Sequence, residues 1–143
     1  NVLSPNHPNS GEDGSVLVQA GDKMPGIPEH QFKASAEYQV SSSISVGLDF
    51  LLNSGQFLRG DEANLLSKTP GFGLVNLRGR YKYNDRFEFY FKTTNLFDKE
   101  YVNFGMLGED PTEVLGNSAS PSPIYYAPGA PIGFWVGAKI DLW

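Results

Sequence analysis

The sequence predicts an all-β fold, in which antiparallel strands form a segment of a transmembrane β-barrel. Apolar and polar residues alternate through several segments of the chain, the connections between these segments are short and long in strict alternation, and aromatic residues gather near both ends of the segments. No stretch approaches the roughly 18 consecutive apolar residues of a membrane helix. We therefore expect strands, not helices, to cross the membrane.

The first two expected strands, residues 31–40 and 44–53, form a hairpin. Even positions in both segments are apolar and odd positions are mostly polar, with Leu51 as the exception. Alternation with period two gives each strand one apolar face and one wet face. The connection at 41–43 is very short, so the two strands pair in antiparallel fashion.

Three further segments continue the pattern. Residues 74–83 and 87–95 alternate in the same way and are joined by a tight turn containing Asn84 and Asp85, residue types that favour turns. Residues 132–142 form the fifth expected strand.

The remaining residues are expected to be loops. Residues 53–73 and 96–131 form long, polar connections rich in Gly and Pro. Residues 1–30 also have loop composition, with a short strand at 15–20. Residues 61–66 have room for a single helical turn at most.

Strand length favours a membrane barrel over a soluble sandwich. Strands of about ten residues, tilted near 40°, cross an apolar band of about 25 Å. Five strands cannot close a barrel, and open edges carry backbone groups that lipid cannot satisfy, so we expect the chain to be a fragment. The alternative is a secreted soluble β-sandwich that binds a glycan or a protein through its long loops.

Composition excludes several other functions. The net charge of −5 and the absence of basic clusters argue against nucleic-acid binding. The sequence contains no nucleophile motif and no phosphate-binding loop, so we predict no enzyme, no catalytic residue and no cofactor. His7 and His30 lie far apart, and no metal site is predicted. The loop carboxylates are expected to be solvated: Glu12, Asp13, Asp61, Glu62, Glu109 and Asp110.

Five motifs resemble the C-terminal part of TonB-dependent outer-membrane receptors. They occur in the family's order: GDKMPGIPEH at 21–30, GQFLRGDEAN at 55–64, GFGLVNLRGRYKY at 71–83, NLFDKEY at 95–101 and PGAP at 128–131. The resemblance extends from about residue 21 to the end of the chain. NLFDKEY is similar to the most recognisable barrel signature of that family.

This resemblance implies a 22-stranded barrel, of which the chain supplies the last five strands, filled by a plug domain that lies outside the chain. It also implies the outer membrane of a Gram-negative bacterium and active uptake of a scarce nutrient, a ferric siderophore or another iron source. The implied partners are outer-membrane lipid, the plug, TonB through the plug, and an iron chelate. Residues 1–30 would form an extracellular loop region, and 31–143 the barrel strands. Receptors of this family usually end on an aromatic residue facing lipid, whereas Trp143 is in phase with Asp141 and Lys139.

The candidate functional residues fall into three groups. The signature residues Asn95, Leu96, Phe97, Asp98 and Tyr101 are expected to close the end of a strand, with Asn95 and Asp98 bound to turn amides. Residues on the wet strand faces are expected to line the lumen or contact the plug: Lys33, Glu37, Asp49, Arg78, Arg80, Lys82, Glu88 and Lys92. The residues expected to contact ligand lie in loops: Phe104, Met106, Tyr125 and Tyr126.

Overall fold

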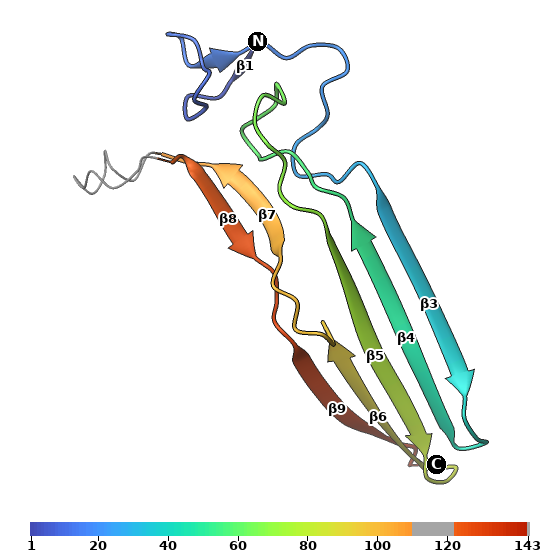
Figure 1. Cartoon of the computed structure of the whole chain (residues 1–143). Coiled ribbons are helices and arrows are strands. Elements are labelled where there is room, and N and C mark those ends of the chain that lie inside the picture. Colours follow the sequence, from blue (N-terminus) through green and yellow to red (C-terminus); the bar gives the residue numbers. More distant parts are fainter. Residues whose placement is uncertain (110–121, 143) are drawn as a thin grey trace. The chain divides into compact units, whose positions relative to one another are not determined.

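A computed structural model describes residues 1–109 and 122–142 of the chain. Within these residues the regular elements are all β-strands (Figure 1). The strands are β1 (Val2–Leu3), β2 (Ser15–Val16), β3 (Gln31–Gln39), β4 (Ile44–Asn53), β5 (Phe72–Lys82), β6 (Phe87–Thr94), β7 (Val102–Leu107), β8 (Ile124–Pro128) and β9 (Gly133–Ile140). Residues 61–66 form turns without a helix. A search of the described residues found no helix with the length and apolar character needed to span a membrane.

Five strands form one antiparallel sheet in the order β3-β4-β5-β6-β9, as the sequence predicts (Figure 1). The expected bounds agree with the observed ones to within two residues at each end, and β4 matches at both ends. Paired residues in neighbouring strands lie on the same face of a sheet. The register therefore defines an apolar face through Phe32, Leu52 and Gly73, and a polar face through Glu37, Gly47 and Arg78.

The two short turns are held by side-chain oxygens. The Ser41 hydroxyl accepts hydrogen bonds from the amides of Ser43 and Ile44, at 3.3 and 3.1 Å. Asn84 Oδ1 accepts from the amides of Arg86 and Phe87, both at 2.9 Å. Ser and Asn favour turns because they can bond the backbone in this way.

The chain divides into two compact units. The sheet unit contains Gln31–Asn53, Phe72–Glu100 and Ala130–Trp143. The loop unit contains Asn1–His30, Ser54–Gly71 and Tyr101–Gly129.

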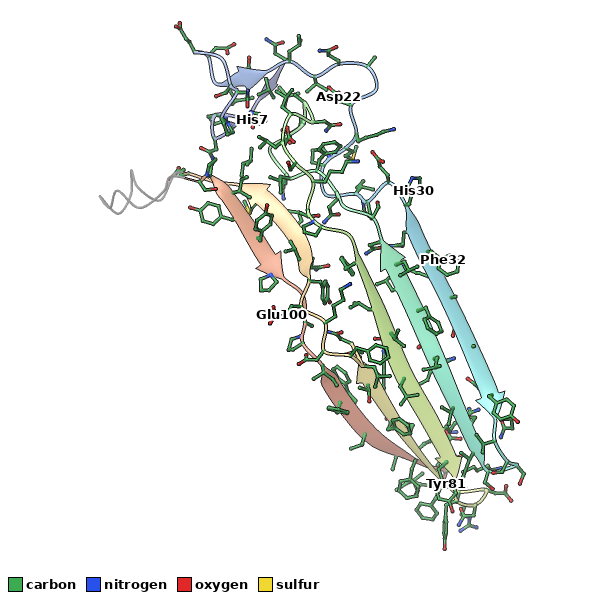
Figure 2. All side chains as sticks on the ribbon, viewed as in Figure 1. His7, Asp22, His30, Phe32, Tyr81 and Glu100 are labelled. Carbon is green, nitrogen blue, oxygen red and sulfur yellow. The ribbon has the colours of Figure 1, made fainter. Side chains whose placement is uncertain are left out.

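The buried apolar side chains of the described residues all belong to the loop unit. They are Val16, Leu58, Ala63 and Leu107. The sheet unit instead leaves its apolar face uncovered, and Val136 is 86% exposed. Figure 2 shows two aromatic residues of this face, Phe32 on β3 and Tyr81 on β5.

The long connection at 96–131 is not wholly a loop, contrary to expectation. It contains the antiparallel hairpin of β7 and β8. The β-pattern is hard to recognise because the register shifts between Val102 and Phe104 and because Gly105 interrupts the alternation of side chains. The short strand expected at 15–20 shrinks to β2, which pairs with β1.

Candidate functional site

The predicted lumen residues share the polar face of the five-stranded sheet. Strand pairing aligns Glu37, Gly47, Arg78 and Lys92 in one row across β3 to β6. The other predicted lumen residues lie on the same face by the period of two: Lys33, Asp49, Arg80, Lys82 and Glu88. The sequence therefore placed these charges on one face correctly, whereas their proposed role stays a prediction.

Arg78 is the centre of the ion pairs on this face. Its guanidinium lies 3.4 Å from the Glu37 carboxylate and 3.7 Å from that of Asp49, and Arg80 lies 3.7 Å from Glu37. Arg78 also donates to the Ser35 hydroxyl at 3.1 Å, and that hydroxyl donates to Asp49 at 2.6 Å. The cross-strand network fixes the guanidinium, although exposed pairs of this kind contribute little stability individually.

Gly47 makes room for the Arg78 side chain. A Cβ atom at position 47 would lie 2.5 Å from Arg78 Nε, closer than two atoms can approach without movement. A hollow of about 300 Å³ beside this row is lined by Glu37, Arg78, Arg80 and Lys92, among others. The hollow combines three cations with one carboxylate, so its balance of charge is positive.

At the turn end of β5, Lys82 pairs with Asp85 at 2.8 Å. The hydrogen bond and the charge of Lys82 hold the pKa of Asp85 below its ordinary value. Glu88 stands opposite Lys82 in the register and opposite Lys139 on its other side. Charges of opposite sign therefore alternate across β5, β6 and β9 at this end of the sheet.

The NLFDKEY segment is bound to the PGAP segment. Asn95 is almost fully buried; its Nδ2 donates to the carbonyls of Lys99 and Ala130 at 2.9 and 3.1 Å, and its Oδ1 accepts from the Lys99 amide at 2.9 Å. Asp98 Oδ1 accepts from the amide of Ile132 at 2.8 Å. The expected amide bonds of Asn95 and Asp98 are thus present, and they reach residues that the sequence analysis did not connect with them.

Two backbone conformations explain the residue types in this segment. Asn95 and Asp98 have φ values of 49° and 46°. Asn and Asp tolerate this left-handed region better than most side chains. The Tyr101 ring covers Gly129, where an added Cβ would overlap the ring. Of the other signature residues, the Leu96 amide donates to Val75 at 2.8 Å, and Phe97 is exposed.

A buried histidine–aspartate pair organises the loop unit. His7 Nε2 lies 3.0 Å from Asp61 Oδ1, and both side chains are fully buried (His7 is labelled in Figure 2). Asp61 also accepts from the amides of Leu65 and Leu66 at 2.8 and 3.0 Å, while His7 Nδ1 accepts from the amide of Asn9 at 3.0 Å. The prediction that Asp61 is solvated is wrong. Turns at 61–66 fold back onto this carboxylate, and residues 54 positions apart give no local signal of the contact.

The other loop carboxylates that the structure describes do not gather into a group of potential metal ligands. Asp13 binds the amide and hydroxyl of Ser15, and these bonds lower its pKa. Glu62 Oε1 accepts from the Gly60 amide at 3.2 Å, while its buried Oε2 has no hydrogen-bond partner in the part of the chain that the structure describes. Asp110 and Trp143 lie outside the described residues. No group of three potential metal ligands occurs among residues 1–109 and 122–142.

The predicted ligand-contact residues lie on the β7–β8 hairpin. Met106 pairs with Tyr125, and both are 42% exposed. Phe104 shares their face, whereas Tyr126 pairs with Gly105 on the opposite face. The hairpin therefore brings three of the four candidates together and separates the fourth, although no bound ligand tests their role.

Sequence reasoning missed a fourth residue on this face. Arg59 forms a parallel bridge with Met106, in which the Arg59 amide donates to Gly105 at 2.9 Å and the Leu107 amide donates to Arg59 at 2.8 Å. The only sequence signal is the position of Arg59 within GQFLRGDEAN. Nothing local in that motif predicts pairing with a strand more than forty residues away.

The fold and the motifs define a receptor barrel of the TonB-dependent class. Residues 9–96 match the family described as TonB dependent receptor-like, beta-barrel, and the chain belongs to this family.

Similar proteins include the catecholate siderophore receptor Fiu of Escherichia coli K12. It is 27% identical over 133 residues, which are 92% of this chain and 16% of the relative. The closed-form crystal structure of the E. coli K12 ferric-catecholate import receptor Fiu has a TM-score of 0.63 at 25% identity, covering 92% of this chain and 16% of that one. The copper transporter OprC has a TM-score of 0.58 at 21% identity, covering 82% and 18%, and shows the fold alone. The chain thus spans about one sixth of the length of the curated relatives that it matches.

Proposed function

We propose that this chain is the C-terminal barrel part of an outer-membrane receptor that takes up a ferric siderophore of the catecholate class in a Gram-negative bacterium. The observation that carries the proposal is its similarity, over 92% of its length, to a catecholate siderophore receptor. The family match over residues 9–96 favours this reading over a secreted sandwich. Siderophore receptors bind and transport, so the proposal involves no catalysis.

The two faces of the sheet support an orientation in the membrane. Exposed apolar side chains such as Phe32 and Val136 fit a lipid environment, because lipid removes the cost of exposing them to water. The opposite face, with Arg78 and Glu37, fits a polar lumen. Backbone groups at the free edges of β3 and β9 require further strands, and a 22-stranded barrel supplies them.

The polar face is proposed to contact a plug domain that fills the lumen. Its charges have both signs, and the Arg78 network holds several of them in fixed positions. A surface of this kind favours a polar protein partner that can be released, since exposed ion pairs are individually weak. Energy from TonB would reach this surface through the plug.

The loop unit is proposed to lie on the extracellular side. Its described residues include the N-terminal region 1–30, the segment 54–71 and the β7–β8 hairpin. In receptor barrels the long connections are extracellular and the short turns are periplasmic. Residues 31–143 would then supply the five strands together with two of these long connections.

The ligand would contact the hairpin. Phe104, Met106 and Tyr125 share one face and present an aromatic ring, a thioether and a phenol. Such groups suit a flat aromatic ligand such as a catecholate ring. Tyr126 faces the other way and is a weaker candidate.

Cell fractionation and growth test the proposal. An antibody against residues 1–20 would be used on soluble and outer-membrane fractions of the source cell, and the gene would be deleted. We expect a band much heavier than this chain in the outer membrane alone, and loss of growth on a ferric catecholate as sole iron source. Complementation of the deletion strain by the intact gene should restore growth. The same gene should not restore growth in a strain that also lacks TonB. A soluble band, or unaltered growth on every catecholate tested, would overturn the proposal.

A further inference from the structure

Three side chains from three separate segments form a row on the β7–β8 hairpin. The parallel bridge aligns Arg59 with Met106, and the antiparallel ladder aligns Met106 with Tyr125. Paired residues in neighbouring strands project to the same side. The row therefore places a guanidinium, a thioether and a phenol ring next to one another, all at exposed positions.

Arg59 differs from Arg78 and Arg80, which both have close acidic neighbours. Arg78 and Arg80 both have carboxylates within 4 Å, whereas no carboxylate of residues 1–109 and 122–142 lies within that distance of Arg59. In a chain of net charge −5, an arginine without such a partner is available to an anion. Guanidinium groups bind anionic oxygens through a planar fork and also stack on aromatic rings.

A hollow lies beside this row. Its volume is about 230 Å³, and Arg59, Glu62, Met106 and Leu107 contribute to its wall. Glu62 Oε2 is buried and has no hydrogen-bond partner among the described residues, which is costly for a carboxylate oxygen. Because this oxygen is inaccessible to solvent, a group in the hollow would contact the rest of the Glu62 side chain and not Oε2.

We propose that Arg59, Met106 and Tyr125 form a binding subsite for a catecholate arm of a ferric chelate. Arg59 binds the anionic oxygens, and Met106 and Tyr125 contact the ring. This subsite rests on the proposed function. It adds Arg59 as the residue that favours a negatively charged chelate. The anionic aromatic class fits better than a neutral chelate, because the row contains a cation without an acidic partner.

The experiment uses the longer receptor polypeptide that we propose carries this segment, purified in detergent. Its probes are a ferric tris-catecholate, which carries net negative charge, and a neutral ferric trihydroxamate, with binding followed by quenching of intrinsic fluorescence. Arg59→Gln should weaken catecholate binding about tenfold and hydroxamate binding by less than about twofold. Arg59→Lys keeps the charge but not the planar fork of donors. Its catecholate affinity should therefore lie between that of Arg59→Gln and that of the unaltered receptor.

Arg86→Gln is the matched control, because it removes the same charge from the turn after β5. It should leave both affinities unchanged. In the unaltered receptor, catecholate affinity should fall as salt rises, and Arg59→Gln should reduce this dependence.

The two proposals fail in different ways. If the unaltered receptor binds the catecholate but Arg59→Gln binds it equally well, the subsite is wrong and the proposed function stands. An equal loss for both chelates would also overturn the subsite, since it indicates a structural role for Arg59. If the unaltered receptor binds no catecholate at all, the proposed function fails and the subsite fails with it.

Discussion

The sheet unit and the loop unit achieve order by different means. The sheet is held by long backbone ladders, and its apolar face remains exposed. The loop unit contains the buried apolar side chains of the described residues, and its turns converge on Asp61. In the proposed orientation the sheet faces lipid and needs no apolar core of its own, whereas loops in water must bury side chains and satisfy their backbone groups internally.

This difference predicts where single substitutions act. In the loop unit, loss of one buried polar group leaves several donors without acceptors. In the sheet, loss of one charged side chain leaves the ladder intact. The four predictions below are ordered from the largest expected effect to the smallest.

Asp61→Ala should open the loop unit. His7 and the amides of Leu65 and Leu66 all lose their acceptor, so the free energy of local opening should fall by about 3–5 kcal/mol. Hydrogen exchange measured in the whole receptor should show lost protection at Leu65 and Leu66. Asp13→Ala in the same unit serves as the control and should leave these two amides protected. Unchanged protection in Asp61→Ala would show that the pair does not organise this unit.

Asn95→Ala should destabilise the joint between NLFDKEY and PGAP. The substitution removes three hydrogen bonds and places Ala at a φ of 49°, with an expected cost of about 2–3 kcal/mol. The urea midpoint of receptor unfolding would measure the loss. Asn95→Asp keeps the acceptor for the Lys99 amide but turns an oxygen toward the carbonyls of Lys99 and Ala130, so it should also destabilise the joint. If both variants match the unaltered receptor, the joint contributes no stability.

Gly47→Ala should displace Arg78 from its network on the polar face. Overpacking of this kind typically costs about 1–3 kcal/mol, and we expect the lower end because the side chain is partly exposed. A double-mutant cycle with Arg78→Ala, with the free energy of unfolding measured for each variant, tests whether the clash with Arg78 causes the loss. In the Arg78→Ala background, Gly47→Ala should be nearly neutral. Additive effects would mean that the added methyl group clashes elsewhere.

Lys68→Gln should have the smallest effect. The Lys68 ammonium donates to Glu29 at 2.9 Å, and this bond and charge hold the pKa of Glu29 below its ordinary value. The stability from this pair is therefore present above the ordinary glutamate pKa and is lost as pH falls through the lowered one. NMR titration should show the Glu29 pKa rising in Lys68→Gln. Lys23→Gln is the control and should produce a smaller rise, because Lys23 makes a weaker contribution.

The sheet was predictable because its signal is local. Alternation within 44–53 and 87–95 is visible over a few residues, and each short turn specifies an antiparallel neighbour. The register then follows from matching apolar faces. Even the pairing of a signature asparagine with backbone amides could be expected from the residue type.

The loop unit was not predictable because its contacts are distant and lack a period. His7 and Asp61 are separated by 54 positions, and each alone looks like a solvated loop residue. The register shift near Asn103 and the glycine at 105 conceal the β7–β8 pattern. Arg59 joins the hairpin through one parallel bridge, a contact too short to leave a repeat in the sequence.

The joint at Asn95 has a consequence for how such chains diversify. Asn95 binds Lys99 and Ala130, and Asp98 binds Ile132, so the end of β6 and the start of β9 are joined outside the segment between Tyr101 and Gly129. The segment 101–129 is thus an insertion between β6 and β9 whose two ends lie next to the joint in the sequence. We expect a hairpin of another length or composition to replace this segment without changing the register between β6 and β9, because the bonds of the joint lie outside it.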